Sequence, residues 1–118
     1  MLMEPLTIEQ FSVEGQGVLR LRGPLITENL APFDNAVRRE GASTVVLDFT
    51  DVPYIDSSGL GSLVKAYVSC QKAGRNLVLS GANKRVMKLL EITNTDQLFL
   101  IFSTPWEAIE AIINAGRA

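Results

Sequence analysis

Hydrophobic and polar residues follow two different periods along the chain, and these periods predict where strands and helices lie. Residues 18–22, VLRLR, alternate between apolar and charged side chains at close to every second position, which is typical of a strand with one buried face. Residues 7–13 predict another strand, and the intervening residues 14–17, EGQG, are typical of a turn. The chain is therefore expected to begin with an antiparallel hairpin, which Gly23 and Pro24 end.

Three later segments predict further strands. Residues 43–49, STVVLDF, and residues 76–80, NLVLS, are nearly continuous in apolar side chains, as is typical of strands at the centre of a sheet. Residues 99–102 form a shorter apolar segment of the same kind. Together with the hairpin, these segments predict a sheet of about five strands.

Four other segments carry apolar residues three and four positions apart, which predicts amphipathic helices. They cover about residues 29–40, 57–73, 84–92 and the chain from 105 onward. The last of them begins with TPWE, a capping box with proline at the first helical position. The residues expected on the buried faces are Leu30, Phe33 and Val37; Leu60, Leu63, Val64, Tyr67 and Val68; Val86, Leu89 and Leu90; and Ile109, Ile112 and Ile113.

The resulting order, ββαβαβαβα, indicates an α/β fold. Strand–helix–strand connections make consecutive strands parallel, with right-handed crossovers, and the hairpin adds an antiparallel strand at one edge. We therefore expect a small mixed sheet packed with four helices. No repeat, low-complexity tract or linker divides the chain, so a single domain is expected to span residues 1–118.

Composition agrees with this expectation and excludes several functions. The chain has 118 residues, of which 47% are hydrophobic, enough for one core. Its net charge of −2 indicates no basic surface for nucleic acid. The absence of histidine excludes the common serine triads and histidine-based zinc sites. Cys70 is the single cysteine and is expected to pack in the core, with a redox-sensing thiol as the alternative.

The sequence also predicts a cytoplasmic location. The first residues lack the basic region and the apolar run of a signal peptide. The longest strongly apolar run, residues 98–102, is far shorter than the ~18 residues that a membrane-spanning helix needs. We therefore expect a domain that does not insert into a membrane, and no pattern of residues calls for a cofactor or a metal.

Residues 56–61, DSSGLG, lie where the second helix begins and are the strongest candidate for a functional site. A Walker-type loop would need a lysine and a hydroxyl residue after the last glycine, and a dinucleotide fingerprint would need glycine at Val64. A nucleophile elbow would need a glycine two positions before the serine and a histidine to activate it. None of these motifs is therefore present.

Several interpretations of this segment remain open. Ser57 can cap the helix, which contributes about 1 kcal/mol relative to alanine. Gly59 and Gly61 each cost about 0.8–1.0 kcal/mol relative to alanine inside a helix. These glycines serve either packing against the chain's own sheet or the close approach of another protein. Ser57 can also be a phosphorylation switch, because a helix N-terminus tolerates phosphate whereas a docked partner would be repelled.

These residues and their surroundings resemble the STAS domain family and, within it, the bacterial anti-sigma factor antagonists. The resemblance is carried by VVLDF at residues 45–49, by Val52, by IDSSGLG at residues 55–61, by Gly74 and by residues 76–99. It extends over nearly the whole chain in order and spacing. It implies a small mixed sheet with helices packed against it.

The resemblance also implies a role for each residue of the motif. Ser57 is expected to be the phosphoacceptor, and Ser58 a neighbouring cap or secondary acceptor. Asp56 is expected to orient the serine hydroxyl or the partner. The residues expected to contact the partner are Gly59, Leu60 and Gly61.

The implied partners are an anti-sigma factor that is a serine kinase, and a serine phosphatase. The unphosphorylated protein would sequester the kinase and free a sigma factor, and the phosphorylated protein would release the kinase. The chain would then be a substrate and not an enzyme. Ile26 stands where the family usually has an aspartate, which favours the alternative of a non-switching STAS scaffold or regulator in a signalling complex or a transport system.

Overall fold

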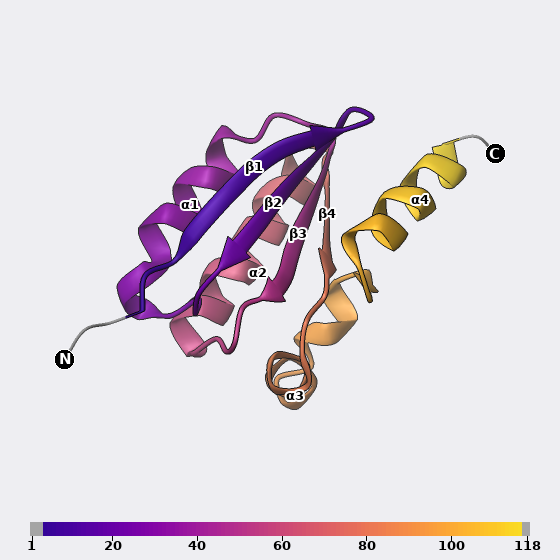
Figure 1. Cartoon of the computed structure of the whole chain (residues 1–118). Helices are drawn as coiled ribbons and strands as arrows, with labels where there is room; N and C mark the ends of the chain where they lie inside the picture. The colour runs from indigo at the N-terminus through magenta and orange to yellow at the C-terminus, as the bar shows by residue number, and fades with distance from the viewer. Residues whose placement is uncertain (1–3, 117–118) are drawn as a thin grey trace.

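A five-stranded mixed sheet lies at the centre of the structure, a computed structural model that describes residues 4–116. Its strands are β1 (Thr7–Val13), β2 (Gln16–Arg22), β3 (Thr44–Asp51), β4 (Asn76–Ser80) and β5 (Ile101–Phe102), in the spatial order β1-β2-β3-β4-β5. β1 and β2 are antiparallel, and each later pair of neighbours is parallel. The α/β class, the mixed sheet and the N-terminal hairpin that the sequence predicts are confirmed (Figure 1).

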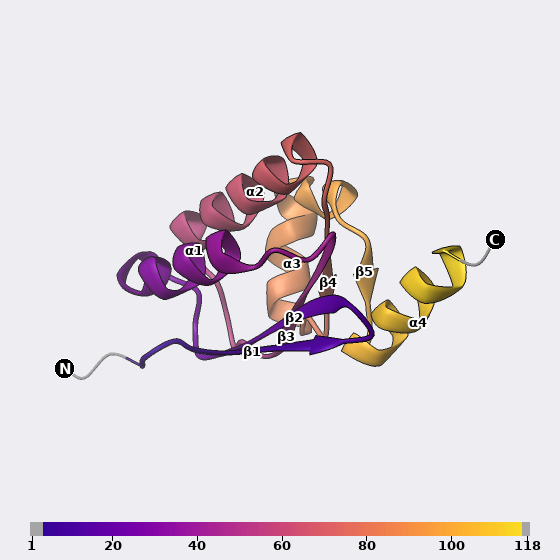
Figure 2. The same cartoon turned by 90° about the horizontal axis from the view of Figure 1, so that it is seen from above.

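The helices divide unequally between the two faces of the sheet. Three of them pack on one face, namely α1 (Leu30–Arg39), α2 (Ser57–Lys72) and α3 (Lys84–Ile92). The fourth, α4 (Pro105–Gly116), lies on the other face beside β4 and β5 (Figure 2). Two short 3₁₀ helices in the connections, η1 (Thr27–Asn29) and η2 (Thr95–Leu98), are not predicted by the sequence.

The larger core lies between the sheet and the three helices. Leu19, Leu47 and Leu79 occupy one row across three neighbouring strands, and all three are fully buried. Phe33 of α1 and Leu63 of α2 belong to the same cluster. Each such side chain contributes about 1.5–3 kcal/mol relative to an exposed one. The smaller core on the other face consists of Val18, Val46, Val78, Ala108 and Ile109, with partly buried side chains around them.

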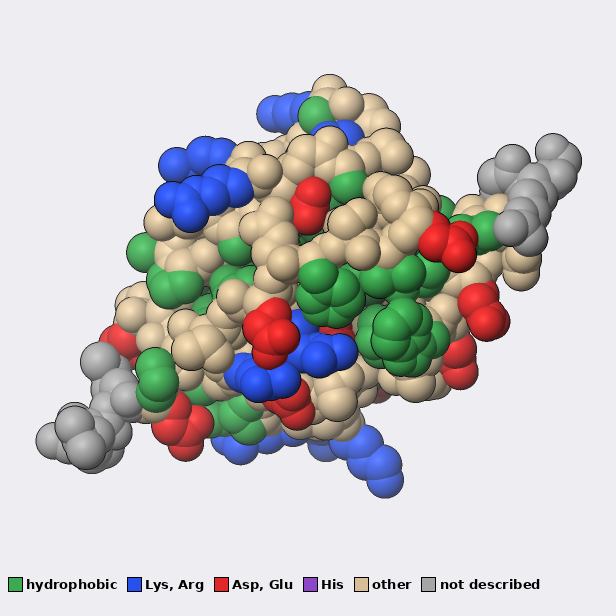
Figure 3. All heavy atoms as spheres, turned by 45° about the horizontal axis from the view of Figure 1, so that its top comes forward, with side chains coloured by type: hydrophobic (Ala, Val, Ile, Leu, Met, Phe, Trp, Pro, Cys, Tyr) green, Lys and Arg blue, Asp and Glu red, His purple; other side chains and the backbone are tan. Residues whose placement is uncertain are grey.

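The part of this second face beside α4 carries charged residues. Arg20 pairs with Asp48 at 3.1 Å, and Arg22 pairs with Glu9 at 2.8 Å and with Asp51 at 3.6 Å. Figure 3 looks toward this face and shows basic and acidic side chains next to one another, beside a hydrophobic area. These charges are paired between strands, which leaves little net charge on this face. The two pairs made by Arg22 are half-exposed, so each contributes at most about 1 kcal/mol to stability.

Two details of the sequence-based expectation are wrong. The apolar pattern places Val68 on the buried face of α2, but this side chain is 41% exposed. A helix turns by about 100° per residue, so Val68 lies about 80° around α2 from Leu60 and outside the stripe that Leu63 continues. The fifth strand is also shorter than residues 99–102, because Phe99 ends η2 and Leu100 is exposed.

Two other expectations are confirmed. Cys70 is buried in the larger core, and this burial raises the pKa of its thiol, an effect that the nearby charge of Arg75 partly offsets. At the start of α4, Thr104 Oγ1 accepts a hydrogen bond from the Glu107 N–H at 3.1 Å. The Glu107 carboxylate reaches back to the N–H of Ser103, one residue earlier than in the usual capping box.

The parallel strands bring three loops to one edge of the sheet. Residues 23–26, 52–56 and 81–83 follow the carboxyl ends of β2, β3 and β4, and carboxyl ends of parallel strands meet at the same edge. Helices α2 and α3 both begin there. The segment 56–61 therefore lies at the edge where α/β proteins commonly bind their ligands.

Candidate functional site

Asp56, and not Ser57, is the N-cap of α2. The backbone of Asp56 is extended, and its Oδ1 accepts a hydrogen bond from the N–H of Gly59 at 2.7 Å. Aspartate caps a helix about as well as serine does, so the residue before Ser57 takes the role that the sequence interpretation gave to Ser57. Ser57 is instead the first helical residue and is exposed, which leaves its hydroxyl available to other proteins.

The second carboxylate oxygen of Asp56 holds the neighbouring loop. Asp56 Oδ2 accepts hydrogen bonds from the N–H of Thr27 at 3.0 Å and from its hydroxyl at 3.1 Å. The backbones also pair, because Leu25 N–H donates to Tyr54 O and Asp56 N–H donates to Leu25 O, both at 3.2 Å. One side chain therefore fixes the start of α2 and the loop that leads to α1.

These hydrogen bonds keep the carboxyl group of Asp56 ionised. Burial alone would raise its pKa, but the N–H groups of Gly59, Thr27 and Ser58 and the Thr27 hydroxyl stabilise the carboxylate. The pKa of Asp56 consequently lies below its ordinary value of 3.8. A carboxylate with a lowered pKa is a weak base and accepts a serine proton poorly. Asp56 is therefore poorly suited to act as a general base toward the hydroxyl of Ser57.

The two glycines of the motif differ in their surroundings. A Cβ on Gly59 would lie 1.9 Å from the carbonyl oxygen of Leu25, so close packing within the chain requires glycine there. A Cβ on Gly61 would meet nothing within 4 Å, and Gly61 is exposed. Internal packing, one of the two open interpretations, thus explains Gly59 and leaves Gly61 unexplained.

The burial of the motif corrects the expected contact surface. Gly59 and Leu60 are both buried in the fold, because they lie on the face of α2 that packs on the sheet and on the loop at Leu25. Ser58 is half-buried, and Ser57 and Gly61 are exposed. Of the three residues predicted to contact the partner, only Gly61 is thus exposed, as is the predicted phosphoacceptor Ser57.

Contacts from the start of α3 also fix this edge, and the sequence interpretation missed them. Asn83 caps α3 through a 2.8 Å hydrogen bond from the N–H of Val86 to its Oδ1. Its amide nitrogen donates to the carbonyl oxygens of Val52 and Pro53 at 3.3 and 3.1 Å. An asparagine just before an amphipathic segment is a helix-start signal that identifies the cap, although it does not reveal the contacts with residues 52–53.

A cation–π contact adds a second link between α3 and the same loop. The guanidinium of Arg85 lies 4.7 Å from the ring centre of Tyr54, two residues before Asp56. The loop that presents Ser57 is therefore held from one side by Thr27 and from the other by the first turn of α3.

The position of Ile26 is now defined as well. Ile26 is half-buried and directly precedes Thr27, the residue that binds Asp56. The resemblance to the STAS family leads one to expect an aspartate at this position. Ile26 brings no charge. Asp56, the residue directly before Ser57, is therefore left as the acidic candidate at this edge.

The described residues contain no cluster of three or more acidic or cysteine side chains that could hold a metal ion. No helix among residues 4–116 is long and apolar enough to cross a membrane.

Comparison with known proteins identifies the family. The sequence model of the STAS domain matches residues 8–108, so the chain belongs to the STAS domain family. A protein of Thermotoga neapolitana, named as a candidate anti-sigma factor antagonist, is 35% identical over 80 residues, which cover 68% of this chain and 70% of that protein. An anti-sigma-B factor antagonist of Listeria monocytogenes is 40% identical over 72 residues, 61% of this chain and 59% of that one.

Solved structures share the fold. The crystal structure of a candidate anti-sigma factor antagonist from Thermotoga maritima matches with a TM-score of 0.82 and 30% identity, covering 88% of this chain and 92% of that chain. The unphosphorylated form of the anti-sigma factor antagonist SpoIIAA matches with a TM-score of 0.72 at 19% identity, and a sulfate transporter family protein of Wolinella succinogenes with 0.76 at 20%. Each of these two matches covers 92% of this chain; it covers 96% of the SpoIIAA chain and 93% of the Wolinella succinogenes chain. At these identities the two structures show the fold alone.

Proposed function

We propose that this protein is an anti-sigma factor antagonist that is switched by phosphorylation of Ser57. The observation that carries the proposal is the exposed hydroxyl of Ser57 at the first position of α2, where Asp56 provides the cap in its place. The names of the relatives in Thermotoga and Listeria support the antagonist function. In the proposed cycle the unmodified protein binds a serine-kinase anti-sigma factor in the cytoplasm and thereby frees a sigma factor.

The switch follows from the charge that phosphorylation adds. A phosphoserine carries about −1.5 to −2 charges at neutral pH. Within the fold, the positive end of α2 favours this charge by about 0.3–1 kcal/mol, and the exposed position keeps the phosphate hydrated. The fold is therefore expected to survive the modification.

The same charge is expected to be unfavourable for the binding of a partner. Docking over Ser57 would remove water from the phosphate and bring a dianion and the Asp56 carboxylate together at the interface. Like charges placed together at an interface cost several kcal/mol, and each ~1.4 kcal/mol lowers the affinity tenfold. Phosphorylation is expected to release the kinase, and a serine phosphatase would restore the unmodified state. In this cycle the protein is a substrate and catalyses nothing itself.

The experiment that tests this proposal is phosphorylation by the cognate kinase. Each serine-kinase anti-sigma factor of the source organism would be incubated with the purified protein and ATP, and the modified peptides mapped by mass spectrometry. We expect phosphate on Ser57, none on the Ser57→Ala variant and a normal yield on Ser58→Ala. Phosphate only at sites other than Ser57 and Ser58, or no phosphate with any of these kinases, would contradict the proposal.

A second candidate function is a non-switching STAS module that regulates a signalling complex or a transport system. The half-buried Ile26 favours it, because the site then lacks the acidic residue that phosphorylated members usually have there. The fold is shared with a sulfate transporter family protein, which is compatible with such a role. Stable binding of a partner that is unaffected by Ser57→Asp would favour this second function over the first.

A further inference from the structure

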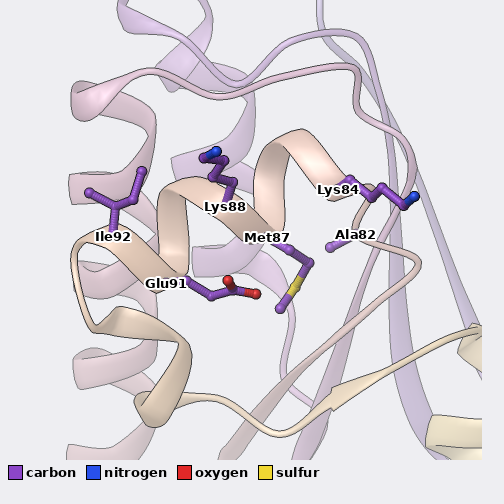
Figure 4. Close-up of a pocket in the computed structure, with 6 residues that line it drawn as sticks. All are labelled: Ala82, Lys84, Met87, Lys88, Glu91 and Ile92. Carbon is purple, nitrogen blue, oxygen red and sulfur yellow. The ribbon is translucent and has the colours of Figure 1, made fainter.

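The outward face of α3 forms a second surface beside Ser57, which we call the α3 ridge and define as Lys84, Met87, Lys88 and Ile92. Lys84 lies three positions before Met87 and four before Lys88, and Lys88 lies four before Ile92, so the set covers an arc of about 140° of the helix surface, from Met87 to Ile92. With Ala82 and Glu91 they line a shallow groove of about 440 Å³ (Figure 4). Figure 4 shows Met87 between Lys84 and Glu91 along the helix.

The charges of α3 run against the helix dipole. Lys84 and Arg85 are its first two residues, and its first turn has no acidic residue. Cations at the positive end of a helix are unfavourable, each by about 0.3–1 kcal/mol when exposed. Lys84 and Lys88 also repel each other across one turn, at about 0.2–0.5 kcal/mol. At the other end, Glu91 lies in the last turn, where the dipole disfavours an anion.

Other helices of the same chain have the favourable arrangement. Arg38 and Arg39 lie in the last turn of α1, and Lys72 lies in the last turn of α2, where a cation stabilises the helix. No ion pair within the described residues compensates Lys84, Arg85 or Lys88. Arg85 is used within the chain, where it stacks on Tyr54, but within residues 4–116 Lys84 and Lys88 make no such contact, so their charges cost stability in the isolated chain and point to a use outside it.

An apolar strip accompanies these cations. Ile92 is 69% exposed, one of the largest exposures of an apolar residue in the described part of the chain, and the half-buried Met87 lies about one and a half turns earlier along α3 and lines the same groove. An apolar centre within a polar rim is the usual composition of a protein-binding surface.

This surface is continuous with the phosphoacceptor edge. Asn83, which caps α3, binds the carbonyl oxygens of Val52 and Pro53, and Arg85 stacks on Tyr54. The start of α3 and the loop that presents Ser57 are thus held together as one rigid unit. A partner that covers Ser57 and extends over residues 52–54 would meet the start of the α3 ridge.

We propose that the α3 ridge is the second half of the docking surface for the anti-sigma factor and that it accepts an acidic patch carrying an apolar side chain. The acidic groups would face Lys84 and Lys88, and the apolar side chain would occupy the groove beside Met87 and Ile92. This inference rests on the proposed function. It also strengthens the switch, because a phosphate on Ser57 would repel the partner's acidic patch.

The test is charge reversal on the ridge. The variant Lys84→Glu/Lys88→Glu places an acidic residue at the N-terminus of α3, which the dipole favours, so it is expected to fold normally. The control Arg39→Glu/Lys72→Glu makes the same change in net charge at two exposed helix ends away from α3. Both would be titrated with the anti-sigma factor kinases used above, at about 50 mM and about 500 mM salt, where screening differs strongly.

We expect the ridge variant to bind about 10- to 100-fold more weakly at low salt, mainly through a slower association rate, with a smaller loss at high salt. The control is expected to stay within about threefold of the unmodified protein at both salt concentrations. The single variant Ile92→Ser is expected to speed dissociation without changing the salt dependence, since it removes only the apolar contact.

The outcomes separate this inference from the proposed function. If the unmodified protein binds none of the kinases, the proposed function fails and this inference fails with it. If it binds and the ridge variant binds equally well, only the role of the α3 ridge is wrong. If the ridge variant instead loses binding to phosphatidylglycerol vesicles while its affinity for the kinase is unchanged, the ridge is a lipid contact and the inference is overturned.

Discussion

Replacing Asp56 by alanine removes the one side chain that joins the start of α2 to the loop before α1. It eliminates the cap on the Gly59 N–H, which contributes typically about 1 kcal/mol, and two charge-assisted hydrogen bonds from Thr27, each about 1.5–3 kcal/mol in buried settings. The carboxylate is only partly buried, so solvent screening places the Thr27 bonds at or below the low end of that range. We therefore expect Asp56→Ala to lower the free energy of unfolding by about 2–3 kcal/mol, close to 10 °C in Tm for a domain of this size.

Urea unfolding followed by far-UV circular dichroism would measure this loss. Asp56→Ser keeps a capping oxygen but cannot reach Thr27, so it is expected to lose about half as much. Glu28→Ala, which removes an exposed carboxylate from the same loop, is the matched control and should change stability by less than about 0.5 kcal/mol. An Asp56→Ala variant as stable as the unmodified protein would refute the account of how this edge is held.

Three further perturbations test other parts of the site. Gly59→Ala should destabilise the fold by about 3 kcal/mol or more, because its Cβ would collide with the carbonyl group of Leu25. Gly61→Ala should stabilise the fold by up to about 1 kcal/mol, because its Cβ would meet no other atom. Equal effects of the two substitutions in thermal melts would contradict this difference between the two glycines. Because the pKa of Asp56 is lowered on folding, its contribution is fully present above its ordinary value of 3.8 and is lost as the pH falls through the lower folded value. Lowering the pH should therefore reduce the free energy of unfolding more in the unmodified protein than in Asp56→Ala. Parallel plots of this free energy against pH for the two proteins would count against a stabilising contribution from the Asp56 carboxylate. Ser57→Asp should fold within about 0.5 kcal/mol of the unmodified protein yet fail to bind the anti-sigma factor in a pull-down, while Ser57→Ala binds with or without ATP; equal binding by both variants would rule out a charge mechanism.

Local periodicity was sufficient to predict the order of the elements. The alternation in residues 18–22 and the apolar strand 43–49 depend on neighbours in sequence, and both correspond to observed strands, β2 and β3. The start of α4 was likewise predictable, because the capping signal of residues 104–107 lies within one turn.

The identity of the cap on α2 could not be predicted in the same way. Asp56 and Ser57 are about equally good caps, and the choice depends on Thr27, which is 29 residues away in sequence and satisfies the second oxygen of Asp56. The requirement for glycine at position 59 likewise depends on the backbone of Leu25.

The contacts from α3 illustrate the same limit. Asn83 binds carbonyl groups about 30 residues earlier in the chain, and Arg85 stacks on Tyr54. No local pattern contains such pairs, since they form only when two loops meet at the carboxyl edge of the sheet. Val68 shows that a periodic pattern can also extend one residue beyond the face that is buried.

A phosphate on Ser57 is expected to abolish partner binding while the fold remains intact. The most direct test is to prepare the protein with and without phosphate on Ser57 and to measure, on both samples, the Kd for the anti-sigma factor and the free energy of unfolding. We expect an affinity at least about 100-fold lower for the phosphorylated protein, with a change in stability below about 0.5 kcal/mol. Equal affinities, or a loss of binding matched by a comparable loss of stability, would contradict this expectation.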